Sequence, residues 1–250
     1  PTDIQVMVNN NEKGASILRI VEVIGQDNLE RIDEDTIYFI IRALNQLNVD
    51  LIRNKILAPK LLSENYSKFI HLFDSVNNVF HLASDVSIPY CVEKPNESMY
   101  NNIVSSMNVL ECSRVHNINK FILSSTSAVY GNTLFNPNYE HQQVQCLNTY
   151  SISKYSAEQL CQMYYNLYGL KTVIFRYFNV YGEGQHKTGQ YAPVMSIFKR
   201  QKDNKEPLTV VEPGYQTRDF IHVNDIVHAN ILASQKDLDK YGEVFNVGTG

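Results

Sequence analysis

The segment "KFILSSTSAVYG", residues 120–131, has the pattern of a buried β-strand that runs into a polar turn. Its first residues are almost continuously apolar, as in strands covered on both faces, and the serines, threonine and glycine that follow favour turns. Residues 77–84 and 171–182 have similar strand patterns. Residues 98–117 and 150–169 have the three-to-five-residue apolar spacing of helices.

Strands that alternate with helices in this way predict βαβ units and a parallel sheet. We therefore expect an α/β fold, a Rossmann-like doubly wound parallel sheet with helices on both faces. Gly169 is the expected C-terminal stop of the helix at 150–169. The residues of that helix expected to face the core are Ile152, Leu160, Tyr164 and Leu167.

The polar stretch 182–190 is the expected hinge between two parts of the chain. Residues 1–182 should form the sheet domain, and residues 183–250 a smaller substrate-binding lobe together with a strand that returns to the sheet. The lobe should contain a strand at 208–212. Because the return strand leads directly into the final glycine turn, we expect the lobe to be truncated at its C-terminus.

The composition is that of an ordinary globular protein and argues against two classes of partner. The 250 residues are 44% hydrophobic and 19% charged, with a formal net charge of −4. No basic surface for nucleic acid is therefore expected, and no apolar run approaches the roughly 18 residues of a membrane span. The four cysteines show no CxxC spacing, which favours free thiols over a disulfide framework or a metal site. We expect a cytoplasmic protein without a metal centre.

Three side chains with proton-transfer chemistry fall at one predicted sheet edge. In open α/β sheets, ligands bind in the crevice at the carboxyl ends of the strands, and Thr126 ends one strand. Tyr150 and Lys154 stand four apart, on one face of the first turn of the next helix. Such a pair alone is common on surface helices. With the threonine it forms a set in which we expect the ammonium to lower the pKa of the phenol.

Seven short segments carry a resemblance to a known family: "VFHLAS", "SSTSAVYG", "YSISK", "RYFNVYG", "YAPVMSIF", "QTRDFIHVNDIVHA" and "FNVGTG". With these in register, residues 77–250 resemble the extended short-chain dehydrogenase/reductase family, in particular its NAD-dependent sugar-nucleotide epimerases and dehydratases. The resemblance implies that residues 1–182 are an NAD-binding domain. It also implies that Thr126, Tyr150 and Lys154 are the catalytic groups.

The same resemblance implies further ligand contacts. Phe178 is expected against the nicotinamide, and Asn179 and Arg218 on the diphosphate of a nucleotide sugar, because a planar guanidinium suits two-point phosphate binding. The alternative for Arg218 is a surface ion pair with Asp219. The expected substrate contacts are Thr126, Tyr150, Asn179 and Arg218. The expected NAD contacts are Asp27, Asn28, Ile56, Ala83, Ser84, Asn102, Ser124, Tyr150, Lys154 and Phe178.

The turn after Thr126 bears on the reaction. Dehydratases of this family carry an Asp–Glu pair there, because eliminating water needs an extra acid and base, whereas this chain has Ser127 and Ala128. The resemblance therefore implies a 4-epimerase of a UDP-hexose, acting through a 4-keto sugar while Tyr150 removes and restores the 4-hydroxyl proton. A homodimer is expected. The alternatives are another dehydratase or reductase, and a non-catalytic nucleotide-sugar-binding relative with a degenerate cofactor site.

The opening of the chain departs from the family pattern. Where the family has GxxGxxG, which lets a pyrophosphate approach a helix N-terminus, residues 6–18 read "VMVNNNEKGASIL". Asp27 follows a strand pattern and is expected on the adenosine ribose, with a solvated turn acid as the alternative. Asn54 and Lys55 stand where Gly and Asp are usual. Residues 1–76 are therefore atypical of an NAD-binding domain.

Overall fold

The chain divides into two compact units, Pro1–Ser75 and Val76–Gly250, and the second holds the sheet and the cleft discussed below. Besides a few positions before residue 70, the computed structural model describes residues 70–133, 136–185 and 193–250. Outside the described residues lie the predicted NAD contacts Asp27, Asn28 and Ile56 and the atypical Asn54 and Lys55.

Four strands form the predicted parallel sheet: β1 (Asn78–His81), β2 (Lys120–Thr126), β3 (Thr172–Tyr177) and β6 (Glu243–Val247). They pair in the order β1-β2-β3-β6, and every pair is parallel. The strand predicted to return to the sheet ahead of the final glycine turn is β6. The central strands β2 and β3 are the most buried, which explains their near-continuous apolar sequence.

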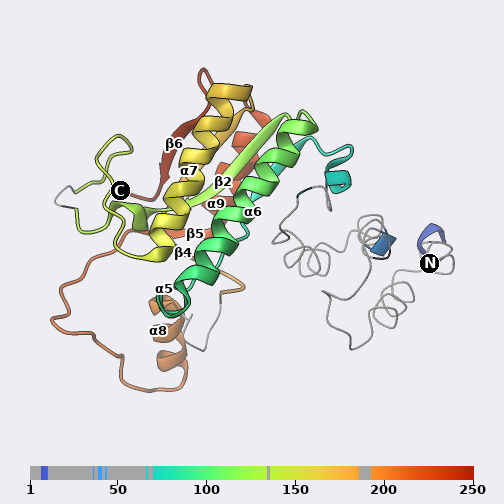
Figure 1. Cartoon of the computed structure of the whole chain (residues 1–250). Helices are drawn as coiled ribbons and strands as arrows, with labels where there is room; N and C mark the ends of the chain where they lie inside the picture. Colours follow the sequence, from blue (N-terminus) through green and yellow to red (C-terminus); the bar gives the residue numbers. More distant parts are fainter. Residues whose placement is uncertain are drawn as a thin grey trace. The chain divides into compact units, whose positions relative to one another are not determined.

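Helices cover both faces of this sheet (Figure 1). The helices α6 (Pro95–Val115) and α7 (Thr149–Tyr168) pack against each other on one face, and α9 (Val223–Gln235) lies on the other. The doubly wound arrangement is therefore confirmed. None of the helices in the described ranges is long and apolar enough to cross a membrane. The core on the α9 side of the sheet contains Ile122, Val173, Phe175, Ala233 and Tyr241.

The inner face of α6 carries several small polar side chains beside the buried apolar Val109 and Leu110. The buried serine hydroxyls donate to carbonyls of the preceding helical turn, as Ser113 does to Val109 O over 2.6 Å, and Ser106 Oγ also lies 2.9 Å from His81 Nε2 of β1. The apolar Met107 points outward and is exposed. Small inner residues allow α6 to pack closely against its neighbours. The buried serines are Ser98, Ser105, Ser106 and Ser113.

Local signals fix both ends of α7. Asn148 and Ser151 form a capping box, in which the Ser151 N–H donates to Asn148 Oδ1 (2.9 Å) and the Asn148 N–H donates to Ser151 Oγ (3.2 Å). Gly169 adopts the left-handed conformation with φ 71°, which confirms the predicted stop. Ile152 and Leu167 are exposed, so their prediction as core residues was wrong. The buried face of α7 is partly polar, and apolar spacing therefore misplaces it.

The chain changes sheets at Phe178, immediately after β3. The next strand, β4 (Asn179–Tyr181), pairs in parallel with β5 (Phe220–His222) in a separate two-stranded sheet. No strand forms at 208–212, where one was predicted, and the apolar side chains of that stretch are exposed because no neighbouring strand pairs with them. The other described elements are α5 (Ile88–Glu93), α8 (Val194–Asp203) and the 3-10 helices η3 (Ile70–Phe73) and η4 (Ser127–Tyr130).

Candidate active site

A cleft of about 940 Å³ opens at the carboxyl ends of β2, β3 and β6. Groups from distant parts of the chain meet there because the strands of a parallel sheet end at one edge. Five residues that the sequence predicts for the site line this cleft: Thr126, Tyr150, Phe178, Asn179 and Arg218. The lining also includes Asn136, Asn138, Tyr177, Asp219 and Asn246.

Thr126 and Tyr150 are held in the cleft by the ends of β2 and α7. Thr126 caps η4, since its Oγ1 accepts a hydrogen bond from the Ala128 N–H (3.1 Å). The capping box of α7 places Tyr150 in the first turn of that helix. The Thr126 side chain lies close enough to the phenol to lower its pKa as a hydrogen-bonding group. The structure therefore brings together the hydroxyl and the phenol that the topology predicts.

Burial dominates the acid–base behaviour of Tyr150. It raises the pKa of the phenol above its ordinary value, while the hydrogen bond with Thr126 opposes the rise and the Cys91 thiol adds to it. Among the described residues, Lys154 has no part in this shift. The prediction that its ammonium lowers the pKa of the phenol was therefore wrong for these contacts, since burial raises that pKa and Lys154 is not among the groups that shift it.

Lys154 lies one helical turn after Tyr150 and is buried behind the cleft rather than lining it. Burial lowers the pKa of this lysine to about 8, although the Cys161 and Glu158 side chains act in the opposite sense. His81 at the end of β1 shares this interior, and burial together with the Lys154 charge lowers its pKa to about 3. At neutral pH the imidazole is uncharged and the ammonium is charged.

Phe178 and Asn179 occupy the junction between the two sheets. The Phe178 ring packs on Gly248, where an added Cβ would lie 3.1 Å from the ring and would collide with the Asp219 carboxylate. Asn179 Nδ2 donates to the Asp219 carbonyl oxygen over 2.8 Å and ties β4 to β5. The two side chains that the resemblance places on ligands are thus fixed in the cleft wall.

Arg218 offers an exposed guanidinium to the cleft. Its Nη1 donates to the Thr217 carbonyl oxygen (2.7 Å). The Asp219 carboxylate is used elsewhere, since it accepts hydrogen bonds from the N–H groups of Thr249 (2.9 Å) and Gly250 (3.2 Å). The alternative reading of Arg218 as the ion-pair partner of Asp219 is therefore not found in the described contacts.

Besides Lys154, four described residues that were predicted to contact NAD do not line this cleft. One of them, Asn102, is buried and joins separate segments: its Oδ1 accepts from the Asp85 N–H (2.7 Å) and its Nδ2 donates to Ser153 Oγ (3.0 Å). Its described role is to hold the loop after β1 against α7. Contact with NAD stays a prediction for all four, which are Ala83, Ser84, Asn102 and Ser124.

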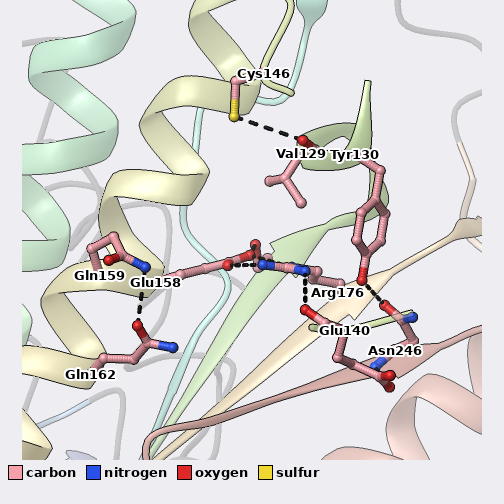
Figure 2. A network of polar contacts seen from close by, with 10 residues as sticks. Val129, Tyr130, Glu140, Cys146, Glu158, Gln159, Gln162, Arg176 and Asn246 are labelled. Carbon is pink, nitrogen blue, oxygen red and sulfur yellow. Dashed lines mark hydrogen bonds and ion pairs between the residues drawn. The ribbon is translucent and has the colours of Figure 1, made fainter. Parts of the chain in front are cut away.

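A buried polar network that the sequence analysis did not predict lies behind the cleft (Figure 2). Glu158 and Arg176 form an ion pair in which Nη2 lies 2.6 Å from Oε2 and Nε lies 3.0 Å from Oε1. Arg176 Nη1 donates to the Glu140 carbonyl oxygen (3.2 Å), and its guanidinium lies over the Tyr130 ring at 4.8 Å. The sequence does contain a signal for this network, since Arg176 is the one charged residue of the otherwise apolar strand β3. A buried charge requires a partner, and the arginine therefore predicts a buried acidic residue nearby.

The network continues from Tyr130 to β6. Tyr130 OH donates to Asn246 Oδ1 (2.6 Å), and the Asn246 N–H donates to Glu140 Oε1 (2.8 Å). Asn246 Nδ2 donates to the Asn138 carbonyl oxygen (3.0 Å). Because Tyr130, Asn138 and Asn246 all line the cleft, the network fixes part of its wall.

Comparison with known proteins agrees with this geometry. The model of the NAD-dependent epimerase/dehydratase family matches residues 21–248. The chain belongs to this family. NAD is the family's cofactor, and a phenol, a hydroxyl and an aromatic ring of this chain share one cleft, which suits the nicotinamide end of that cofactor.

Several relatives of this epimerase/dehydratase act on UDP-sugars. The UDP-glucose 4-epimerase of Azospirillum brasilense is 34% identical over 170 residues, which are 63% of this chain and 49% of that protein. The Thermotoga maritima UDP-glucose 4-epimerase, solved with UDP-glucose, superimposes with a TM-score of 0.69 at 35% identity and covers 74% of this chain and 60% of that one. The Bacillus cereus UDP-glucuronic acid 4-epimerase, solved with UDP-glucuronic acid and NAD, superimposes with a TM-score of 0.67 at 30% identity. The match covers 76% of this chain and 58% of that one. The chain thus spans about half the length of the curated relative.

Proposed function

We propose that this chain is the cofactor-binding and catalytic part of a nucleotide-sugar 4-epimerase that interconverts UDP-glucose and UDP-galactose. The observation that carries the proposal is the Tyr150–Thr126 pair in a cleft that also exposes Arg218. Ser127 and Ala128 follow the threonine, so no carboxyl group stands there to help remove water. This favours epimerisation over dehydration.

In the proposed reaction Tyr150 acts as base and then as acid. Its phenolate takes the proton of the sugar 4-hydroxyl, and Thr126, hydrogen-bonded to the phenol, bridges the two oxygens. Bound NAD supplies the hydride acceptor and donor at C4. After the 4-keto sugar has turned in the cleft, Tyr150 returns the proton to the C4 oxygen on the opposite face.

Arg218 is suited to the diphosphate of the substrate. Its guanidinium lines the cleft, and the neighbouring Asp219 carboxylate is already bonded to the Thr249 and Gly250 N–H groups and does not neutralise it. A planar guanidinium can hold two phosphate oxygens at once. The sugar would then lie toward Tyr150, at the other side of the same cleft.

Turnover of UDP-galactose with NAD tests the proposal. The expected product is UDP-glucose, and Tyr150→Phe should lower kcat about 10³-fold because the proton acceptor is lost. Tyr168→Phe, at an exposed position near the end of the same helix, is the matched control and should leave kcat unchanged. Normal turnover by Tyr150→Phe would reject the catalytic assignment. A 4-keto-6-deoxy product would identify a dehydratase instead.

A non-catalytic nucleotide-sugar-binding relative is the second candidate. The sequence "NNNEKG" at 9–14, in place of the glycine motif, favours it, because side chains there would crowd a pyrophosphate. Calorimetry with NAD separates the candidates. Stoichiometric NAD binding excludes the second one, whereas UDP-hexose binding without any NAD binding supports it.

We also propose that the protein is a homodimer that pairs through α6 and α7. Both helices expose large apolar side chains, Met107 and Val115 on α6 and Ile152 and Leu167 on α7, and apolar clusters on a surface mark association sites. Sedimentation equilibrium should give twice the chain mass, and Ile152→Asp should halve it. A native protein that stays monomeric at assay concentration would exclude the dimer.

A further inference from the structure

Glu158 is a fully buried carboxylate that the proposed chemistry does not use. We infer that Glu158, clamped by Ser125 and Arg176, is a positioning residue that fixes α7 on the sheet so that Tyr150 meets Thr126. The inference rests on the proposed function, since it concerns the same phenol and hydroxyl. Glu158 itself touches neither substrate nor cofactor in this assignment.

Three donors converge on this carboxylate from two strands. From β3, Arg176 Nε donates to Oε1 at 3.0 Å and Nη2 donates to Oε2 at 2.6 Å (Figure 2). From β2, Ser125 Oγ donates to Oε1. Ser125 and Arg176 are buried as well. Hydrogen bonds from β2 and from β3 therefore attach α7 to both central strands at Glu158.

The attachment point lies next to the catalytic groups. Ser125 and Arg176 face each other in the β2–β3 ladder, and the next position along β2 is Thr126, which lines the cleft. On α7, Glu158 follows Tyr150 by two helical turns, roughly 12 Å along the axis and on the same side. Because a helix moves as a rigid rod, a shift at Glu158 displaces Tyr150 relative to Thr126.

An apolar contact could stabilise this junction without fixing its geometry. Replacing a buried ion pair by well-packed apolar residues is often neutral or stabilising, while apolar association has no preferred direction and tolerates small shifts. Proton transfer does not tolerate them, since a misplacement of about 1 Å can lower a rate roughly 10²-fold. Placement of the helix, more than stability, therefore accounts for a charged pair at this depth.

Ser125→Ala tests the β2 side of the clamp. It removes one bond to Glu158 and leaves the ion pair, so kcat should fall about tenfold while KM for UDP-galactose stays within about twofold. Ser113→Ala is the matched control, because this serine is equally buried but bonds only within α6, to Val109 O, and it should change neither constant. A kcat for Ser125→Ala within twofold of native would overturn the inference.

The double variant Glu158→Leu/Arg176→Met tests the whole clamp. The apolar pair should fold, with kcat about 10²-fold lower and with Tyr150 displaced from Thr126 in its crystal structure. Lys120→Met, which removes a buried cation at the opposite end of β2, should lower the melting temperature and leave kcat unchanged. Full turnover by the double variant, or an unchanged distance between the phenol and the threonine hydroxyl, would contradict the positioning role.

The native protein is assayed first, which separates this inference from the proposed function. If it converts no UDP-hexose, the proposed function fails. The positioning role is then decided by crystal structures of the native protein and of Ser125→Ala. A distance between the Tyr150 and Thr126 side-chain oxygens that is unchanged in Ser125→Ala would overturn it, and a longer distance would support it.

Discussion

Replacing Lys154 by methionine should make the NAD-free protein more stable and the enzyme less active. Burial lowers the pKa of Lys154 from 10.5 to about 8, so near neutral pH the folded chain holds a charge that its surroundings disfavour. Methionine fills similar space without that charge. The family resemblance also implies that Lys154 is catalytic, and on that expectation kcat should fall.

The size of the effect follows from the two pKa values. The fall from 10.5 to about 8, at about 1.4 kcal/mol per pH unit, corresponds to about 3 kcal/mol as an upper limit. Between these values the unfolded chain still binds the proton that the folded chain has released, so native stability rises with pH across this window. The advantage of Lys154→Met should therefore be largest near pH 7 and shrink as the pH approaches 10.5.

Urea unfolding of the NAD-free native protein and of Lys154→Met, from pH 6 to pH 10, measures this difference. Lys199→Met is the control, because Lys199 is 68% exposed in an i,i+4 pair with Asp203 and should change the free energy of unfolding by less than about 0.5 kcal/mol. A Lys154→Met protein that is less stable than native at pH 7 would refute the reasoning. A difference that does not vary with pH would refute it too.

Three further changes test the site and its support. Arg218→Lys should raise KM for UDP-galactose about tenfold and leave kcat within twofold in steady-state kinetics, because an ammonium cannot bind the diphosphate at two points. Thr126→Val should lower kcat about 10²-fold. Because the lost hydrogen bond lowers the Tyr150 pKa, the pH at which activity rises should move upward, and an unmoved pH profile would argue against the bond. Asn148→Ala should cost about 1 kcal/mol in thermal unfolding, whereas Asn148→Ser should restore most of it by keeping the cap.

Local signals made most of the fold predictable from the sequence. The apolar runs of β2 and β3 and the stop at Gly169 depend on nearby residues, and the structure has them where they were expected. The burial of the serines of α6 was not predictable in this way, because small polar residues in a helix have the composition of a surface face. Residues 208–212 have a strand's composition but no strand to pair with, and pairing depends on the rest of the fold.

The site was predictable where chain topology alone brings groups together. Thr126 and Tyr150 share a sheet edge in any fold with this order of elements, so their meeting followed from the sequence. Glu158 and Arg176 come from a helix and a strand whose relative rotation the sequence does not reveal. The burial that raises the Tyr150 pKa likewise depends on packing, which is why the expected effect of Lys154 on the phenol was wrong.

The serine-rich inner side of α6 limits how this chain can diverge. A larger residue at Ser105 or Ser106 would force neighbouring helices and strands apart, and overpacking of this kind is destabilising, whereas alanine or glycine at position 105 would fit. Evolving sequences should thus vary freely along the outward side of α6 and stay small along the inward one. Such small residues would help to align distant members of the family even where the tyrosine at position 150 has been lost.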